Sequence, residues 1–552
     1  MDQADAIIVG AGLAGLAAAA ELGDRGKRVL IVDQEPRRFL GGQAFWSLGG
    51  LFMIDTPEQR RMGIRDSRAL ALSDWMGSAQ FDREEDAWPR QWAEAYIDFA
   101  ATEMRPWLHA MGLRWFPVVG WAERGGGFAD GHGNSVPRFH LTWGTGPGII
   151  EHFVRRCLEH EKTGLIQFHF RHQVDRIDME NGAAKGVSGT VLADDPAERG
   201  QKTNRDAVGD FAFAAPSVIV TSGGIGGNFE MVRKVWPTDR LGPAPKEMIA
   251  GVPAHVDGRM IAISEAAGGR VINGDRMWHY TEGVRNWDPI WPAHGIRVLP
   301  GPSSMWFDAE GNRFAPPALP GFDSMSTLRM ILETGYDYSW FVLTQKVIKK
   351  EFALSGSEQN PDLTSKKWSE VIRQRVLSGK NATGPIEAFK EKGEDFVVAN
   401  DLASLVHGMN GIADGNLIDE TKLRAQVEAR DAQIDNPFSK DAQMMAIHAA
   451  RNYRGDRLLR TAKPHKFLDP ANGPLIAVKL HILTRKTLGG LQTNLESQMI
   501  GADGNTVPGL FAAGEVAGFG GGGYHGYNAL EGTFLGGCIF SGRNAGRSGA
   551  IA

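Results

Sequence analysis

The sequence predicts an α/β fold in which the two ends of the chain build one parallel-sheet domain and the middle forms an inserted α+β segment. Three observations predict it. Residues 6–15 join a short apolar run to a Gly-x-Gly-x-x-Gly pattern, residues 28–33 form a second apolar run that ends in an aspartate, and glycine clusters vanish between residues 273 and 470. A strand, a glycine turn and a second strand are typical of a nucleotide-binding βαβ unit.

The first predicted element is this Rossmann-like unit. Gly10 allows the tight turn after the first strand, and Gly12 lets the backbone approach a pyrophosphate. Gly15 lets the following helix, which begins near Leu13 and Ala14, pack close to the sheet. Asp33 ends the second strand, where a carboxylate accepts hydrogen bonds from a ribose hydroxyl and disfavours a 2′-phosphate. The unit therefore predicts FAD or NAD, and not NADP.

Composition limits the possible partners. The chain has 552 residues, 42% of them hydrophobic and 23% charged, and a formal net charge of −5, which gives no basic excess for nucleic acid or an anionic membrane. No apolar run approaches a membrane span and no apolar leader precedes the first strand, so we expect a cytoplasmic protein. Cys157 and Cys538 are expected to be buried thiols, and no metal site is predicted.

Further glycine clusters follow the first unit, at residues 41–42, 47–50, 222–227, 488–490 and 518–526. One long ligand that the backbone approaches at many points would explain them, because side chains there would obstruct it. FAD fits this pattern better than NAD.

Several of these clusters carry recognisable motifs. Residues 218–224 match a strand that ends at the adenosine part of FAD, residues 509–515 match a last strand whose acidic residue holds the ribityl chain, and residues 529–532 match the start of a helix that faces the flavin pyrimidine. In these motifs the chain resembles the flavoprotein subunits of fumarate reductase and succinate dehydrogenase and the related 3-ketosteroid dehydrogenases. The resemblance covers both ends of the chain and is patchy in the middle.

The resemblance implies a discontinuous FAD-binding domain with an inserted cap. In addition to the first unit, the residues expected at FAD are Gln34, Gly41, Gly42, Gln43, Ser47, Gly49, Gly50, Val174, Thr221, Ser222, Gly223, Asn228, Gly489, Gly514, Glu515, Asn528, Ala529 and Leu530. Covalent members of the family have a histidine six residues before the double glycine at the isoalloxazine. Gln43 stands there in this chain, so we expect FAD to be bound non-covalently.

Catalytic candidates also follow from the resemblance. Thr281, Glu282 and Arg285 belong to a segment that resembles the family sequence Thr-Glu-Ala-Val-Arg-Gly, in which the Thr and Glu lie beside the substrate's carboxylate end. Tyr524 matches the tyrosine that hydrogen-bonds the 3-keto oxygen in steroid dehydrogenases, and His525 matches a substrate-binding histidine of fumarate reductases. A phenol and an imidazole side by side polarise a carbonyl and stabilise an enolate.

One position departs from both relatives. The family arginine or tyrosine of the cap would fall at Gly321, which has no side chain to transfer a proton; Arg329, Tyr336 and Tyr338 follow further along. Loss of the arginine weakens the case for reducing small dicarboxylates, whereas Tyr524 favours chemistry next to a ketone. Arg485 and Lys486 would hold an anionic substrate or form a solvated loop.

The sequence therefore predicts an FAD-dependent oxidoreductase that acts on a carbon–carbon bond activated by a carbonyl, with hydride transfer to flavin N5. The alternatives are a fumarate-reductase-like enoate reductase and a flavin electron carrier without a small substrate. The expected partners are a small substrate, such as an apolar ketone, and an electron acceptor that is a quinone, another protein or oxygen. Tryptophans between Trp278 and Trp306 would line an apolar cleft or pack in the core.

The predicted domain limits follow from where the motifs stop. Residues 1–272 form the first part of the FAD-binding domain, residues 273–470 the cap, and residues 471–552 the second part of the FAD-binding domain. Within the first part, residues 194–210 predict a solvated hairpin loop. Within the cap, residues 421–433 and 441–453 predict amphipathic helices.

Overall fold

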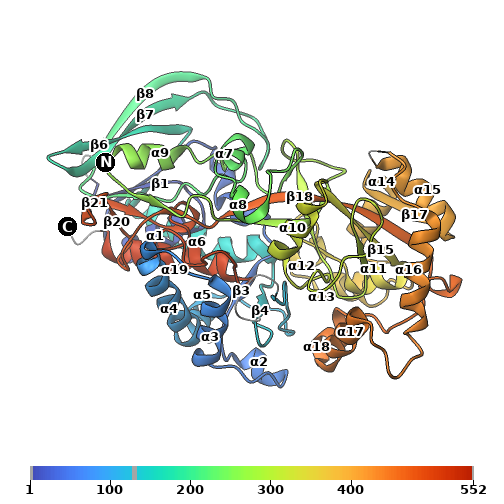
Figure 1. The fold of residues 1–552 in the computed structure, drawn as a ribbon. Coiled ribbons are helices and arrows are strands. Elements are labelled where there is room, and N and C mark those ends of the chain that lie inside the picture. The colour runs from blue at the N-terminus through green and yellow to red at the C-terminus, as the bar shows by residue number, and fades with distance from the viewer. Residues whose placement is uncertain (1–3, 127–132, 414, 550–552) are drawn as a thin grey trace.

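The predicted parallel sheet is present. The computed structural model describes residues 4–126, 133–413 and 415–549 (Figure 1). A six-stranded sheet has the order β20-β21-β9-β1-β2-β5, and all its pairs are parallel except β20 with β21. Its strands are β1 Ala6–Val9, β2 Val29–Asp33, β5 Ile166–Phe170, β9 Val218–Val220, β20 Gln498–Ile500 and β21 Thr506–Ala512. Strands from both ends of the chain therefore share one sheet, which confirms the α/β fold class.

Helices from both ends of the chain pack on this sheet. Helix α1 (Leu13–Asp24) lies against α19 (Thr533–Ser548), and α6 (Thr145–Lys162) also packs on α1. An added Cβ at Gly542 would overlap the carbonyl oxygen of Ala14, so the contact between α1 and α19 needs a residue without a side chain. This contact places the middle of α19 against the start of α1.

A three-stranded antiparallel sheet stands beside the first sheet (Figure 1, upper left). It contains β6 His172–Glu180, β7 Ala183–Leu192 and β8 Ala207–Ala214. The connection between β7 and β8 is the hairpin that the sequence predicts at residues 194–210, but it is shorter because β8 begins at Ala207. It is also not wholly solvated, since Thr203 is buried and its hydroxyl donates to Glu35 at 2.8 Å.

The second large sheet has the order β14-β15-β18-β12-β13-β16, and β10 and β17 also pair with β18. Its strands are β10 Ile249–Ala250, β12 Met277–Arg285, β13 Gly295–Leu299, β14 Met305–Phe307, β15 Tyr338–Thr344, β16 Ala353–Leu354, β17 Phe396–Ala399 and β18 Leu475–Thr487. Most of β18 pairs with cap strands although it follows residue 471. The domain limits stay a prediction, and Figure 1 shows β18 running from one lobe into the other.

Nine helices belong to the same part of the described chain as this sheet. They are α10 Ser324–Glu333, α11 Gln345–Glu351, α12 Pro361–Thr364, α13 Trp368–Arg375, α14 Gly384–Lys392, α15 Leu402–Ile412, α16 Glu420–Ala432, α17 Ala442–Asn452 and α18 Arg454–Leu459. The two helices predicted in the cap are α16 and α17. Leu423 and Val427, one helical turn apart on α16, are fully buried in the apolar core of this lobe.

Shorter elements complete the chain. They are α2 Pro57–Arg61, α3 Arg68–Ala79, α4 Ala87–Thr102, α5 Met104–Met111, α7 Phe229–Lys234, α8 Thr238–Leu241 and α9 Arg259–Ala266, with the pairs β3 Gly50–Phe52 to β4 Phe139–Leu141 and β11 Val271–Ile272 to β19 Gly490–Leu491. Single 3₁₀ turns occupy Arg37–Phe39, Gly42–Trp46, Glu84–Asp86, Pro470–Asn472 and Gly514–Val516.

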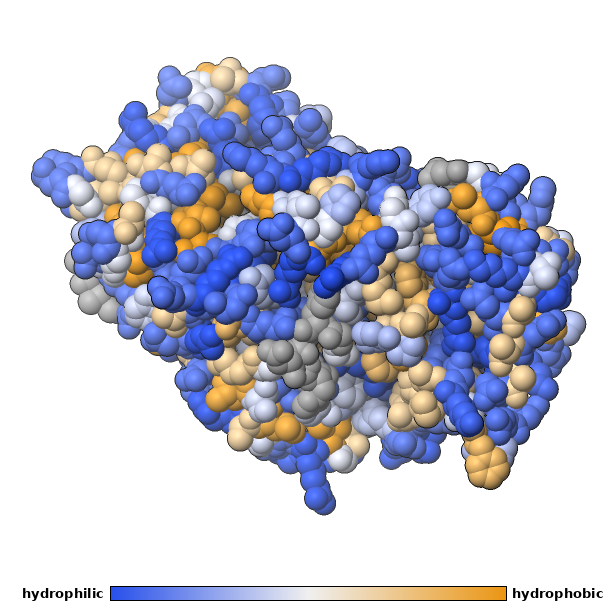
Figure 2. Space-filling view, viewed as in Figure 1, coloured by the Kyte–Doolittle hydropathy of each residue, from blue (hydrophilic) through white to orange (hydrophobic). Residues whose placement is uncertain are grey.

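The surface in view is mostly hydrophilic, and its hydrophobic residues form small separate patches (Figure 2). Among the described residues, no helix has both the length and the apolar character to cross a membrane. Cys157 is buried and Cys538 half-buried, and neither forms a disulfide. Trp278, Trp291 and Trp306 are buried, so core packing accounts for much of the tryptophan-rich segment.

Candidate active site

A large cavity lies where the carboxyl ends of the parallel strands meet the second sheet. It encloses about 1610 Å³ of space between atoms, part of it open to solvent. Its wall runs from the glycine turn after β1 to Tyr280 and Arg297 of the second sheet, so the cavity is shared by both sheets.

The glycine turn after β1 forms one wall. Gly10 has a φ of +108°, and a Cβ there would lie 2.7 Å from the carbonyl oxygen of Thr221, so the turn requires glycine. A Cβ at Gly15 would overlap the carbonyl oxygen of Gly10, so α1 packs on the turn as the sequence predicts. A Cβ at Gly12 would have no protein atom nearer than 4.0 Å and Gly12 lines the cavity. A phosphate can therefore approach this backbone at the positive end of α1.

Asp33 lies at the end of β2 and lines the same cavity. Its two carboxylate oxygens accept hydrogen bonds from the backbone N–H of Ala11 at 2.7 Å and of Glu35 at 2.8 Å. Burial raises the pKa of Asp33, and these two hydrogen bonds oppose the rise. Because each carboxylate oxygen has two lone pairs, the side chain can still accept from a ribose hydroxyl.

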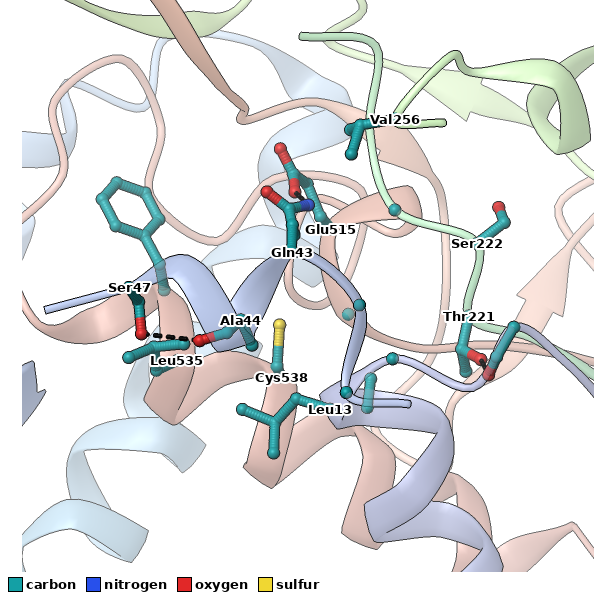
Figure 3. Close-up of a pocket in the computed structure, with 18 of the residues that line it drawn as sticks. Leu13, Gln43, Ala44, Ser47, Thr221, Ser222, Val256, Glu515, Leu535 and Cys538 are labelled. Atoms are coloured by element: carbon teal, nitrogen blue, oxygen red, sulfur yellow. Dashed lines mark hydrogen bonds between the residues drawn. The ribbon is translucent and has the colours of Figure 1, made fainter. Parts of the chain in front are cut away.

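Gln43, Glu515 and Lys486 form a polar chain at the middle of the cavity. The amide nitrogen of Gln43 donates to Glu515, and Figure 3 shows the two side chains pointing toward each other. Lys486 donates to the amide oxygen of Gln43 at 3.1 Å, and burial lowers the pKa of Lys486. The other oxygen of Glu515 accepts from the backbone N–H of Thr487 at 2.9 Å. These groups suit the polar ribityl chain and ring edge of a flavin, and Gln43 offers no nucleophile for covalent attachment.

The cavity brings together most of the residues predicted at FAD. Those on its wall are Gly10, Gly12, Leu13, Ala14, Asp33, Gln34, Gly41, Gly42, Gln43, Ser47, Gly49, Gly50, Val174, Thr221, Ser222, Gly223, Gly514 and Glu515. Not on the wall are Gly15, Asn228, Gly489, Asn528, Ala529 and Leu530.

The residues off the wall have other contacts. Asn228 caps α7 by accepting from the backbone N–H of Met231 at 3.2 Å. A Cβ at Gly489 would overlap the carbonyl oxygen of Asn273, so this glycine permits a close backbone approach. Asn528, Ala529 and Leu530 line a smaller neighbouring cavity of about 310 Å³.

Tyr524 and His525 are fully buried and do not line the main cavity. The Tyr524 hydroxyl donates to the carbonyl oxygen of Thr533 at 2.7 Å, and His525 Nε2 lies 2.8 Å from the Thr533 hydroxyl. Burial raises the pKa of Tyr524 and lowers that of His525 well below its ordinary value. Both rings pack against Trp75, with the His525 ring stacked on it. The structure thus gives both side chains packing partners, and their predicted contact with substrate stays untested.

Thr281, Glu282 and Arg285 also lie off the cavity wall. Thr281 is buried without a partner for its hydroxyl among the described residues. Glu282 is buried and lies 3.4 Å from the Ser324 hydroxyl, and burial raises its pKa. Arg285 is partly exposed at the far end of β12, where it pairs with Glu247 at 3.0 Å. Glu282 is connected to the wall through the Ser324 hydroxyl and Glu123, which accepts from Arg297.

Sequence reasoning missed the polar cluster on the cap side of the cavity. Tyr280, Arg297 and Glu531 line it. Arg297 donates to Glu531 at 2.5 Å and its guanidinium lies 3.6 Å from the centre of the Tyr280 ring, while the Tyr280 hydroxyl donates to Glu531 at 3.0 Å. Glu531 directly precedes Gly532, the N-cap of α19, and its place in the predicted helix start at residues 529–532 was the signal available in the sequence.

The cavity and its cradle of glycines define a flavin-nucleotide-binding protein. The chain belongs to the family described as FAD binding domain, whose model matches residues 5–535. It is 60% identical to a KsdD-like steroid dehydrogenase of Mycobacterium tuberculosis, over 99% of this chain and 96% of that protein. It is 24% identical to a probable fumarate reductase of Shewanella frigidimarina, over 99% of this chain and 74% of that one.

Solved structures agree on the fold. The 3-ketosteroid Δ1-dehydrogenase of Sterolibacterium denitrificans, in complex with 1,4-androstadiene-3,17-dione, has a TM-score of 0.65 at 16% identity, with each chain fully covered. The protein is an FAD-dependent oxidoreductase that acts on a carbon–carbon bond, as the sequence predicts. When bound, FAD supplies the hydride acceptor.

Proposed function

We propose that this protein dehydrogenates a ketosteroid, or an apolar ketone of similar size, at a carbon–carbon bond next to the carbonyl. The observation that carries the proposal is the cap-side wall of the cavity. The cavity that holds the polar cluster of Tyr280, Arg297 and Glu531 is also lined by the apolar side chains of Ala122, Phe139, Leu299, Phe519 and Phe534. An apolar chamber with a few polar groups binds and orients an apolar substrate that has one polar end.

The residues of the chain have separate tasks in this reaction. The apolar wall excludes water from the reacting carbons, and the donors of the polar cluster stabilise negative charge on a carbonyl oxygen. Gly532 caps the start of α19 and lines the cavity. The partial positive charge of this helix end favours negative charge beside it. Lys486, held by Gln43, adds a cation near the same region.

One observation favours a second candidate, a reductase that acts on an anionic enoate. Arg485 lines the cavity, and its side chain forms no ion pair or hydrogen bond with any of the described residues. A carboxylate substrate would bind such a cation. We propose a cytoplasmic enzyme. As a dehydrogenase it passes its electrons to a quinone, another protein or oxygen, whereas as a reductase it would need an electron donor, and the enoate would be the acceptor.

Anaerobic mixing tests the proposal. The oxidised enzyme is mixed with 4-androstene-3,17-dione, a saturated 3-ketosteroid and cyclic ketones, and the flavin absorbance near 450 nm is followed. We expect at least one ketosteroid to bleach the flavin. In the converse experiment the dithionite-reduced enzyme is mixed with fumarate and other enoates. Reoxidation by an enoate, without bleaching by any ketone, would establish the second candidate instead.

A further inference from the structure

The loop at position 321 is built around glycine. Gly321 has a φ of +76°, which side chains rarely adopt, and a Cβ would lie 2.8 Å from the carbonyl oxygen of Pro300. Its own carbonyl oxygen accepts from the backbone N–H of Arg124 at 3.0 Å. This position therefore cannot carry the arginine or tyrosine that the family places in the cap, and a group that takes a proton from the substrate has to come from another element.

Glu531, the residue before the N-cap of α19, has a carboxylate oxygen free for such a proton. Its side chain is 8% exposed and lines the main cavity. Oε1 accepts from the Tyr280 hydroxyl at 3.0 Å and from a terminal nitrogen of Arg297 at 2.5 Å. Oε2 accepts no hydrogen bond from the described residues and, unlike the Nε of Arg297, is not enclosed by protein atoms. The two donors thus fix the carboxylate by one oxygen and leave the other open.

The remaining carboxylates and histidines on the described wall are placed for the nucleotide or are already bonded. They are Asp33, Glu35, His172, His255, Asp257 and Glu515. The first five lie around the end of β2, on β6 and in the segment before α9. Glu515 accepts from Gln43 with one oxygen and from the Thr487 backbone with the other. Glu531 therefore stands alone among them in joining a free oxygen to the cap side of the cavity.

We propose that Glu531 Oε2 takes the proton from the substrate carbon next to the ketone. This inference rests on the proposed function and names its base. The C–H bond breaks, an O–H bond forms at Oε2, and the electron pair moves into an enolate whose charge lies on the ketone oxygen. Carboxylates act as bases for such hydrogens where the enolate oxygen is stabilised. Lys486 and the positive end of α19 at Gly532, both on the wall, supply that stabilisation.

Hydrogen exchange isolates this proton step from the redox step. The dithionite-reduced enzyme is mixed anaerobically with a saturated 3-ketosteroid in D₂O, where neither can oxidise the other, and the deuterium gained beside the carbonyl is followed by mass spectrometry. Glu531→Gln keeps the size of the side chain and an oxygen for the two donors, but removes the base. Glu123→Gln is the matched control, because Glu123 also accepts from Arg297, at 3.1 Å, yet lies off the main cavity.

We expect the wild type and Glu123→Gln to exchange these hydrogens well above the rate in buffer, and Glu531→Gln to exchange them about a hundredfold more slowly or worse. The dissociation constant of the steroid, measured from the perturbation of the flavin spectrum, should change far less than the exchange rate. Exchange by Glu531→Gln at the wild-type rate overturns the inference. So does an equal loss in Glu123→Gln, which would mean that the two carboxylates act only by holding Arg297.

If Glu531→Gln fails to fold, the wild type and Tyr280→Phe still decide. Absence of exchange in the wild type overturns the inference. Tyr280→Phe should slow exchange far less than a hundredfold, because Arg297 still holds Oε1, and a loss of about a hundredfold would assign the proton to the phenol instead. Failure of the proposed function is distinguishable, because the wild type would then neither bind ketosteroids nor be bleached by them.

Discussion

Substitutions at two glycines, Gly12 and Gly15, should distinguish a loss of FAD binding from a loss of protein stability. Gly12 has extended backbone angles of φ −74° and ψ −178°, and a Cβ there would meet no protein atom nearer than 4.0 Å. At Gly15 a Cβ would overlap the carbonyl oxygen of Gly10 and lie 2.7 Å from the Thr221 hydroxyl, inside the 3.0 Å that real Cβ atoms keep. We therefore expect Gly12→Ala to fold normally without FAD and to bind FAD poorly, and Gly15→Ala to be less stable than the wild type with or without FAD.

The magnitudes support this split. Alanine in a helix is favoured over glycine by about 1 kcal/mol, whereas forcing a methyl into packed atoms costs about 1–3 kcal/mol, so Gly15→Ala loses stability on balance. For Gly12→Ala the stability of the FAD-free protein should change by less than about 0.5 kcal/mol. The lower stability of Gly12→Ala relative to the wild type should appear only when FAD is present. FAD at a hundred times its dissociation constant adds about 2.7 kcal/mol to the free energy of unfolding of the wild type, and a variant that does not bind FAD lacks this gain.

Thermal unfolding of both variants, with and without added FAD, provides the assay. The wild type should gain a few degrees on addition of FAD, Gly12→Ala should gain none while matching the wild type in its absence, and Gly15→Ala should unfold earlier in both conditions. If Gly12→Ala binds FAD with unchanged affinity in a fluorescence titration, the cofactor does not lie against this turn and the reasoning fails.

Three further outcomes are expected. Tyr524→Phe removes the hydrogen bond to Thr533 and should lower the free energy of unfolding by about 1 kcal/mol. Turnover should stay within a few-fold of the wild type. A hundredfold loss of turnover would instead support the contact with the substrate's keto oxygen that the sequence predicts. Burial lowers the pKa of His140 and of His279 to about 4, below the unfolded value of about 6.5. The free energy of unfolding, measured with denaturant, should therefore fall by about 1.4 kcal/mol per pH unit for each histidine as the pH decreases from 6.5 toward 4. A stability that does not change with pH over this range contradicts the expectation. With Gln43 in place of a histidine, acid precipitation should release all flavin into the supernatant, and a yellow pellet would show covalent attachment.

The cofactor half of the site was predictable because its requirements are local. A positive φ at Gly10 and an unhindered backbone at Gly12 follow from residue type and spacing alone. The closing carboxylate at Asp33 belongs to the same βαβ unit and follows from the same pattern. The structure places all three on one cavity wall.

The polar cluster of Tyr280, Arg297 and Glu531, at which we propose that substrate binds, was not predictable because distant segments build it. Arg297 reaches Tyr280 because β13 pairs with β12, with Gly283 opposite Arg297, and Glu531 arrives from the start of α19. No sequence pattern gives such pairings. Tyr524 is the opposite case. Its sequence motif resembles that of a substrate-binding tyrosine, but in the structure Trp75 of α3 packs against its ring and Gly537 leaves space for its hydroxyl.

The strand β18 ties the two lobes together mechanically. Its first half, from Leu475 to His481, pairs with β15 in the cap, and its last residue, Thr487, donates to Glu515 on the cavity wall. The strand runs on without a break between these two points, although its pairing with β12 shifts register between His481 and Lys486. Such a bulge bends a strand locally. The cap sheet and the backbone that holds Glu515 are therefore built from one continuous strand, and a change in the sequence of β18 would affect both the cap and the cofactor cavity.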